Sequence, residues 1–533
     1  MIKPSIILKR SKRPARIKIF IFWLVSSFLI GIAMSFGGSI HNHLSPKYIS
    51  KNEAIEDIYY FVKTAEQIHV DLYHTISKDR FHFFVRQLQK SIPDSISVAE
   101  FSKKMRVLVG RLNDGHTNVF FAKELIDNYK KEKCVLPFMI RIENDKIIIK
   151  ESNSDKLSMG DELVSINGIK THELLKLIQY ASADNEANKI KRLEKYFPYY
   201  FYIEYNLRDS VHIRIIRNGK ALNKNVLLTK RMGNRGATKY SYKTIDSSIA
   251  LLRINTFWGI DRNRYISFLD SSFKKIKDEN IHSLVIDVSK NRGGNSDYGA
   301  LILPYINVLK YKFVQKYQIK TSKPEKKYFR KMFIKWYMYP LYPLAFLSEN
   351  GRVYLFKKNG TVNDVSVGVE KLKPVVNAYQ GPVFIFTSNE TYSAAADFVS
   401  AFVYAKRGKV IGDTVGQPYS GFIDAIPVIL PHSKLQAMVS YKKYEYVGAN
   451  ETNTQRGMAP DIYFNVDAIK SETELDNKLI AIIHTADKKY STLCRQAGLK
   501  VSRENPFAAH SLFGYMRSRI SFNIISKRTR VWN

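Results

Sequence analysis

Three short segments carry residues that could perform acyl transfer. The first, Thr387–Ala396, follows an apolar run and precedes a helical pattern, so Ser393 is expected at a helix N-terminus. The helix dipole favours developing negative charge there, and the amide of Ala394 could bind an oxyanion. The alternative is that Ser393 only caps the helix, the commonest role for a serine in that position.

The second segment, Asp287–Asn295, ends a continuous apolar run and contains Gly293 and Gly294. Glycines let backbone amides approach a ligand closely, and ligands bind at the carboxyl ends of strands in open α/β sheets. A Gly293 or Gly294 amide could form a two-donor oxyanion hole with Ala394. The segment matches neither a P-loop nor a dinucleotide-binding fingerprint, and a plain strand–helix turn is the alternative.

The third segment is the turn Asp114-Gly115-His116-Thr117. Of the twelve histidines, His116 is the one held in a glycine-containing turn between an acid and a hydroxyl. A serine is a weak nucleophile until a base takes its proton, and histidine has a suitable pKa for that task. Distance in sequence is no objection, because catalytic triads are spatial.

The elements around these segments predict an α/β fold. Ser283–Val288 and Val383–Phe386 are continuous apolar strands, each followed by a helical pattern (Tyr298–Leu309 and Ala394–Tyr404). This alternation predicts βα units on a mostly parallel sheet. Before them, residues 48–132 have helical periodicity, and residues 135–232 consist of short β runs with one helical stretch, His172–Ile178.

Composition bounds the class of protein. The 533 residues include 45% hydrophobic ones. This composition excludes disorder, collagen, coiled coil and a multi-span membrane protein. The formal net charge is +36. Two cysteines, Cys134 and Cys494, cannot build a disulfide framework, although one bridge between them stays open. The positive excess suits an anionic surface, but it is spread along the chain, so a solvated basic face is the alternative and no nucleic-acid partner is expected.

The first forty residues predict the compartment. A basic run without acidic residues precedes Ile19–Phe36, whose only polar residues are three serines. Eighteen such residues span about 27 Å as a helix, close to the thickness of the hydrocarbon core. Positive charge before the span keeps that end in the cytoplasm. We expect a single-pass cell-membrane protein whose catalytic part is extracytoplasmic (periplasmic or extracellular); a cleaved signal peptide is the alternative.

Taken together, the three segments resemble the carboxyl-terminal processing protease and tricorn-core family of serine peptidases. The other matching blocks are a PDZ-like Gly-Asp-Glu-Leu…Ile-Asn-Gly block and the two segments Gly412–Gly416 and Gly457–Asp461. Each is weak singly, but six in the right order over about 100–465 are a strong signal. The resemblance implies a crotonase-like ββα catalytic core with an inserted PDZ-like β domain, an N-terminal helical region and one N-terminal transmembrane helix.

The resemblance also implies residue roles. Ser393 is the expected nucleophile, with Ala394 and Gly293 or Gly294 as oxyanion hole. Tail-specific proteases use a lysine as base, but the block here reads Thr-Val-Gly416-Gln417, so His116, as in the tricorn-like branch, is the expected base. The remaining roles implied by the family are a catalytic role for Glu451 and substrate-binding roles for Asn291, Gly416 and Gln417.

This sequence departs from the tricorn-like pattern beside His116. That branch has a hydroxyl residue directly before the histidine, where this sequence has Gly115, and Glu451 fits the family's glutamate only approximately. The third catalytic member is therefore open. A non-catalytic protein that binds a peptide or apolar ligand, and a membrane-tethered PDZ scaffold with Ser393 as a cap, are the rival functions.

The predicted catalytic core contains one insertion. Lys310–Lys335 carries ten basic residues and is followed by an aromatic cluster, which suits either an anionic membrane interface or a lid over the cleft. A peptide or protein substrate is expected, and no cofactor or metal; a homo-oligomer stays open. The predicted segments are 1–18 (basic, cytoplasmic), 19–38 (anchor), 48–132 (helical), 135–232 (PDZ-like), 240–466 (catalytic core, with 310–375 inserted) and 470–533 (C-terminal helix and basic tail).

Overall fold

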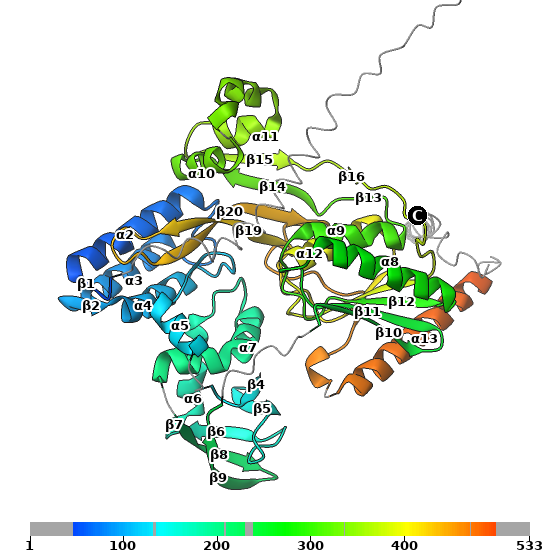
Figure 1. The fold of residues 1–533 in the computed structure, drawn as a ribbon, viewed down its shortest axis with the longest axis horizontal. Helices are drawn as coiled ribbons and strands as arrows, with labels where there is room; N and C mark the ends of the chain where they lie inside the picture. Colours follow the sequence, from blue (N-terminus) through cyan, green and yellow to red (C-terminus); the bar gives the residue numbers. More distant parts are fainter. Residues whose placement is uncertain are drawn as a thin grey trace, which may run out of the picture.

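The computed structural model describes residues 46–131, 135–206, 209–229, 238–334, 336–469 and 471–496 (Figure 1). The predicted cytoplasmic segment and anchor (1–38), Cys134 and the end of the basic tail lie outside these residues. Within the described part of the chain, no helix is long and apolar enough to cross a membrane.

A six-stranded sheet forms the centre of the fold. Its strands are parallel except β10, which pairs antiparallel with β11 at one edge. Both faces are buried, which explains why its central strands read as continuous apolar runs. Across the sheet the strands are β10 (Tyr240–Asp246), β11 (Ile249–Ile254), β12 (Ser283–Asp287), β17 (Val383–Thr387), β18 (Lys409–Gly412) and β21 (Ile462–Tyr463).

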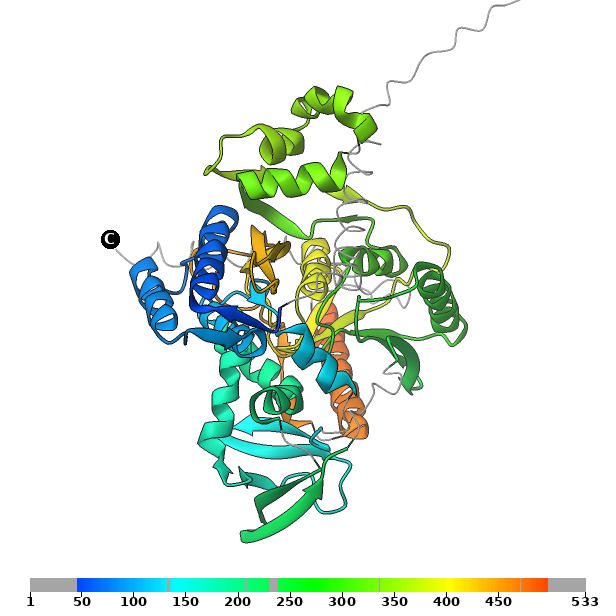
Figure 2. The same cartoon turned by 60° about the vertical axis from the view of Figure 1, so that its left-hand side comes forward.

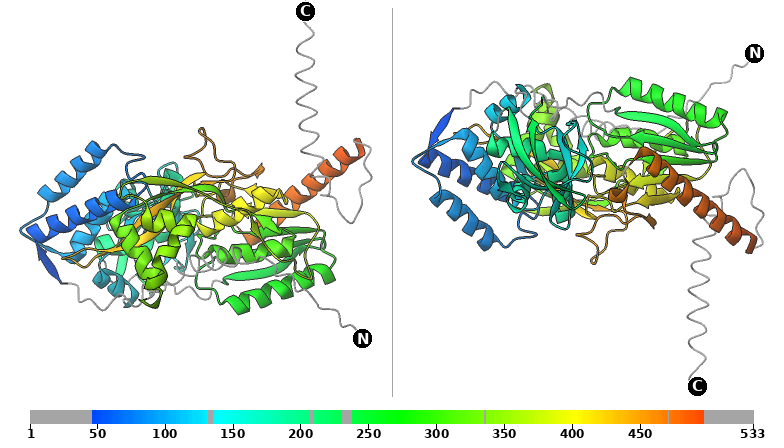
Figure 3. Two further views of the ribbon diagram at one scale, coloured as in Figure 1. Left: turned by 90° about the horizontal axis from the view of Figure 1, so that it is seen from above. Right: turned by 90° about the horizontal axis from the view of Figure 1, so that it is seen from below.

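Helices cover both faces of this sheet (Figure 3). Because strand side chains alternate, Leu252 of β11 packs in the cluster that contains residues of α8, α9 and α12, while Leu251 packs in the cluster of α13. The helices are α8 (Arg262–Asp278), α9 (Ser296–Ile302), α12 (Ala394–Ala405) and α13 (Glu472–Gln496). The helix predicted to reach Leu309 ends at Ile302 and continues as the 3-10 turn η3 (Leu303–Ile306), since Pro304 has no N–H to donate.

A second, antiparallel sheet brings the N-terminal part of the chain to this core. Its strand β20 pairs with the two-residue strand β3, with Val119 opposite Ala437. The turn that holds His116 is therefore tied to the catalytic core through β3. The strands are β3 (Asn118–Val119), β14 (Val314–Lys320), β15 (Val362–Ser366), β19 (Ser420–Ile429) and β20 (Gln436–Tyr446).

The N-terminal region is helical, as its periodicity predicts. A short strand pair, β1 (Tyr48–Ser50) and β2 (Ser95–Ser97), ties the start of this region to the segment that follows its second helix. Its first three helices share the large hydrophobic cluster of the core, so they are packed onto the core, whereas apolar residues of the fourth pack against the cluster of the following β region. The helices are α2 (Lys51–Ile68), α3 (Lys78–Lys90), α4 (Val98–Gly110) and α5 (Lys123–Lys131).

The region after α5 builds a β sheet with a hydrophobic cluster of its own. A long helix, α7 (Glu186–Tyr205), packs on it; the sequence predicted short β runs and a helical stretch at His172–Ile178 here, but not α7. Pro198 and seven Tyr or Phe residues lie within α7, and these types are weak helix formers that conceal a helix in the sequence. The other elements are β4 (Phe138–Glu143), β5 (Lys146–Ser152), β6 (Glu162–Ile166), β7 (Ile169–Lys170), α6 (Thr171–Leu174), η2 (Leu175–Tyr180), β8 (Ser210–Arg217) and β9 (Lys220–Leu227).

The predicted insertion stands at one end of the molecule (Figure 2). It begins and ends at a strand pair, β13 (Lys310–Tyr311) with β16 (Glu370–Lys371). Besides β14 and β15, the insertion contains α10 (Lys323–Phe333), η4 (Trp336–Leu347), α11 (Glu349–Gly351) and η5 (Arg352–Phe356). Outside the insertion, a short turn, η6 (Val466–Ala468), precedes α13.

Candidate active site

Ser393 lies at the turn between β17 and α12 with an unusual backbone. Its φ is 55° and its ψ is −125°, and its hydroxyl makes no capping hydrogen bond to the helix. Such a conformation costs on the order of 1–3 kcal/mol in a residue that has a Cβ, and it persists only where the surroundings impose it. The hydroxyl is therefore exposed for chemistry at the helix N-terminus instead of capping it.

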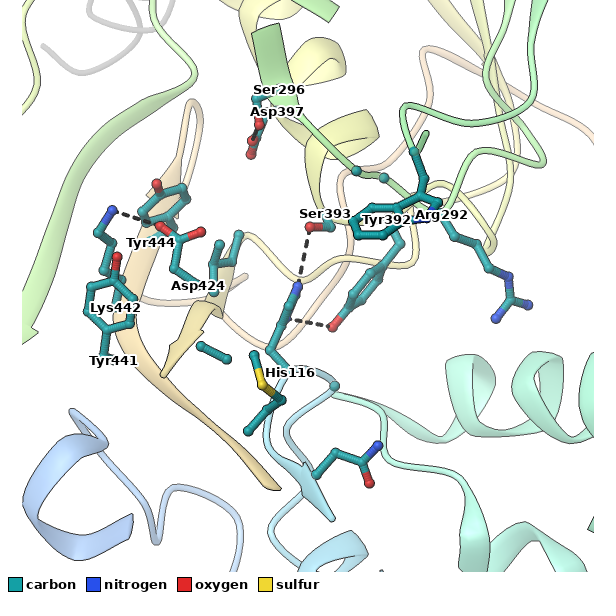
Figure 4. A pocket seen from close by; sticks show the side chains of 18 of the residues that line it. His116, Arg292, Ser296, Tyr392, Ser393, Asp397, Asp424, Tyr441, Lys442 and Tyr444 are labelled. Atoms are coloured by element: carbon teal, nitrogen blue, oxygen red, sulfur yellow. Dashed lines mark hydrogen bonds and ion pairs between the residues drawn. The ribbon is translucent and has the colours of Figure 1, made fainter. Parts of the chain in front are cut away.

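His116 meets this hydroxyl. Its Nε2 lies 3.2 Å from Ser393 Oγ, although 277 positions separate the two residues (Figure 4). Two contacts hold the turn: Asp114 Oδ1 accepts a hydrogen bond from the His116 main-chain N–H (2.8 Å), and Thr117 Oγ1 accepts one from the Ser440 N–H (3.0 Å). The spatial pairing on which the sequence hypothesis depended is present.

The surroundings keep the imidazole neutral. Burial lowers the pKa of His116 below its ordinary value, and the Arg192 guanidinium lowers it further, against the opposite effects of Asp114 and Asp424. A neutral ring with a free Nε2 lone pair is the form that can take a proton from serine. Near neutral pH His116 is thus in the protonation state that a general base requires.

Of the amides predicted to form an oxyanion hole, two remain free. The Gly293 N–H donates to Asn291 Oδ1 at 2.9 Å, which corrects its predicted role. Gly293 is required for another reason: a Cβ on it would lie 2.8 Å from the Ser393 Cβ. Among the described residues, the N–H groups of Gly294 and Ala394 donate to no other protein group, so they can hold an oxyanion.

A pocket of about 410 Å³ opens beside Ser393 and His116. Its wall away from them carries a buried ion pair, with Lys442 Nζ 2.7 Å from Asp424 Oδ2. The pair neutralises both charges, so the rest of the wall sets the character of the pocket. That wall is mostly apolar and aromatic: Phe313, Tyr328, Ile423, Met438, Tyr441 and Tyr444.

The core around Ser393 has a known family pattern. Residues 248–464 match the model of peptidase family S41. The chain carries a peptidase family S41 domain. This confirms the resemblance inferred from the motifs and makes the protein a serine-type peptidase. His116 lies outside the matched residues and reaches the S41 domain through β3.

Solved structures resemble the chain beyond the residues that match the S41 model. Mature CPAF complexed with lactacystin has a TM-score of 0.59 at 14% identity, covering 81% of this chain and 98% of that one. Mature CPAF has a TM-score of 0.58 at 13% identity, covering 80% and 96%. At these identities the likeness shows a common fold. No curated protein sequence matches the chain.

The three predicted substrate-binding residues lie behind Ser393 and support its turn. Gln417 Oε1 accepts a hydrogen bond from the Ser393 N–H (3.3 Å), and the Gly416 N–H donates to Thr391 O (3.0 Å). Asn291 accepts from Gly293, as described above. All three residues are buried, and none lines the pocket, so they cannot touch a substrate there. Their predicted role is corrected to one in shaping the turn.

The structure does not bring Glu451 to the pair. Its side chain is exposed in a turn and does not line the pocket. The acid that reaches His116 is Asp184, which accepts a hydrogen bond from the Tyr392 hydroxyl; that hydroxyl lies 3.4 Å from His116 Nδ1. Sequence reasoning missed Asp184, and the one signal was Gly115, a position without the expected hydroxyl.

Proposed function

We propose that the S41 protein is a membrane-anchored, extracytoplasmic serine endopeptidase that cleaves peptides or protein C-terminal segments through an acyl-enzyme on Ser393. The observation that carries the proposal is the 3.2 Å contact between His116 Nε2 and a serine hydroxyl that caps nothing. The anchor and the compartment rest on the basic run and apolar span of residues 1–38.

The geometry supports the following steps. Ser393 Oγ attacks the scissile carbonyl carbon while its proton moves to His116 Nε2. The carbonyl oxygen becomes an oxyanion, which the Gly294 and Ala394 N–H groups stabilise. The imidazolium gives its proton to the leaving amine as the C–N bond breaks, and a water molecule, deprotonated by His116, then hydrolyses the acyl-enzyme.

The finer fold assignments belong to the same proposal. A crotonase-like core over 240–466 is supported by the parallel sheet whose β12 and β17 end at the oxyanion and nucleophile turns. A PDZ-like module over 135–232 is supported by its antiparallel sheet and separate hydrophobic cluster. The neutral, apolar wall of the pocket favours a bulky apolar side chain next to the scissile bond.

A fluorophosphonate probe tests the reaction directly. The wild-type chain is expected to form a covalent adduct, located on Ser393 by mass spectrometry of the digested protein, while Ser393→Ala takes no label. Ser400→Ala, which alters another serine of the same helix, is the matched control and should label fully. An unlabelled wild type would leave the rival function, a non-catalytic ligand-binding protein on this fold.

We also propose that the insertion touches an anionic lipid surface. Three apolar side chains of η4 are exposed: Leu344 by 57%, Phe346 by 54% and Leu347 by 77%. On α10 of the same projecting insertion, Lys323, Lys327, Arg330 and Lys331 are exposed. Apolar side chains that enter the interface beside cations that attract anionic headgroups are the pattern of peripheral membrane binding.

Vesicle sedimentation tests this surface with a chain that starts at residue 46 and therefore lacks the predicted anchor. We expect binding to vesicles containing phosphatidylserine, and binding at least tenfold weaker for the triple variant Leu344→Ser, Phe346→Ser, Leu347→Ser. Val376→Ser, at an apolar position exposed by 97% outside the insertion, is the control. Equal binding of the triple variant and the control would refute the proposal.

A further inference from the structure

The ring nitrogen of His116 that faces away from Ser393 is near a buried phenol. Tyr392, directly before the nucleophile, stacks on the imidazole with ring centroids 5.2 Å apart and an interplanar angle of 19°. Its hydroxyl lies 3.4 Å from His116 Nδ1 and is hydrogen-bonded to Asp184 Oδ2 (Figure 4 shows Tyr392 beside His116). A chain of three groups therefore leads from the imidazole to a carboxylate.

The carboxylate is itself held in place. Asp184 Oδ1 accepts a hydrogen bond from the Gly115 N–H at 3.2 Å, so the main chain just before the base is tied to the same side chain. Arg192 lies over the Tyr392 ring, with its guanidinium carbon 5.4 Å from the ring centroid, and donates to the Gly115 carbonyl. Asp184 and Tyr392 are both buried.

Gly115 is necessary for this arrangement. A Cβ at residue 115 would lie 2.1 Å from the Tyr392 hydroxyl oxygen and 2.8 Å from Asp184 Oδ2. Any other residue would expel the phenol. The Tyr392 hydroxyl occupies the space that a side chain at residue 115 would fill.

We propose that Asp184 acts through Tyr392 as the positioning acid of the S41 site, holding His116 in the tautomer that can deprotonate Ser393. This inference rests on the proposed function. An ionised Asp184 only accepts hydrogen bonds, so the Tyr392 proton points toward Asp184. The phenol oxygen is then left to accept from Nδ1–H, which leaves the lone pair of Nε2 facing Ser393.

A substitution that neutralises Asp184 should reverse the direction of the hydrogen bonds that lead from Asp184 through Tyr392 to His116. In Asp184→Asn the amide nitrogen donates to the Tyr392 oxygen, so the phenol proton turns toward His116 Nδ1. Nε2 then carries the ring proton and cannot accept one from Ser393. Tyr392→Phe keeps the stacked ring and removes only the hydroxyl. Tyr305→Phe is the matched control, since the buried Tyr305 donates to Asp270 at 2.6 Å in the same way but lies outside the pocket.

The experiment measures the rate of fluorophosphonate labelling of Ser393 between pH 5 and 9. Burial and the nearby Asp114 raise the pKa of Asp184 to about 7, so the wild-type rate should rise through that pH as Asp184 ionises. The other charged groups that face His116 or Asp184 are Asp114, Arg192 and Asp424, and all variants retain them. In Asp184→Asn the rise of the labelling rate near pH 7 should be absent.

At pH 8 we expect labelling at least tenfold slower in Tyr392→Phe and Asp184→Asn, and unchanged in Tyr305→Phe. Because folding raises the pKa of Asp184 to about 7, its ionisation lowers stability between about pH 4 and pH 7, and the full cost is present at pH 8. Asp184→Asn should therefore keep its melting temperature at pH 8, which separates a lost tautomer from a lost fold.

The main chain offers a competing explanation. A backbone hydrogen bond to Phe422 also acts on His116. If Tyr392→Phe labels at the wild-type rate with the wild-type pH profile, Phe422 suffices to orient the ring and the positioning role is refuted. A wild type that takes no label is a different result, because it removes the proposed function itself.

Discussion

Replacing His116 by Ala is expected to lower kcat for peptide hydrolysis about 10⁴-fold or more and to change KM less than about threefold. The loss falls on kcat because the imidazole acts when the proton leaves Ser393 Oγ, 3.2 Å away. The measurement is cleavage of fluorescein-labelled casein, with the cut sites identified by mass spectrometry. His212→Ala, at an exposed position on β8, is the control.

The pair should behave as one unit. Once His116 is gone, the hydroxyl of Ser393 has no base, so the double variant Ser393→Ala, His116→Ala should be no slower than the slower single variant. Independent contributions would multiply instead. Retention of more than a tenth of wild-type kcat by His116→Ala would place the base on another group and remove the central step of the mechanism.

The predictable parts of the site are those encoded in single turns. Ser393 and His116 each lie in a short segment whose glycines, hydroxyls and charged neighbours indicate chemistry, and their meeting follows from the pairing of β3 with β20. The strand before each oxyanion or nucleophile turn was predicted because burial on both faces leaves a continuous apolar run.

The parts that could not be predicted depend on contacts between distant segments. Asp184 lies directly before α7, a helix whose Pro198 and aromatic residues conceal its periodicity. Nothing local shows that this segment returns to a turn near residue 115. Glu451 was an approximate match in the chain and is exposed in space. Asn291 and Gln417 look like ligands in a motif, whereas burial makes them supports of the nucleophile.

Lys442 illustrates the same limit. Lysine is almost never fully buried unless it is paired, and the tyrosine-rich sequence around Lys442 does not show which residue is its partner. In the structure its Nζ lies 5.2 Å from the ring centroids of Tyr317 and Tyr441, and Asp424 is its partner. The partner stands 18 positions away, on the neighbouring strand β19.

The second large effect is therefore on stability. Asp424→Asn should lower the free energy of unfolding by about 3–5 kcal/mol, because it leaves the Lys442 ammonium buried without a counter-charge. Asn is the informative substitution: φ at residue 424 is 52°, a conformation in which Asn is tolerated while most other residues add strain. Differential scanning calorimetry should show a melting temperature several degrees lower.

Two comparisons isolate the ion pair as the cause. In Lys442→Met, Asp424→Asn no charge is left buried, so the double variant should recover most of the lost stability. Glu162→Gln breaks the Lys146–Glu162 pair, which has a similar distance of 2.8 Å but a lysine that is 58% exposed, and it should cost less than about 1 kcal/mol. Since the intact pair carries no net charge, the aromatic and aliphatic residues beside it set the character of the pocket. If the double variant recovers stability, it should also accept the same bulky apolar residue beside the scissile bond, whereas the charged lysine of Asp424→Asn should favour an acidic one.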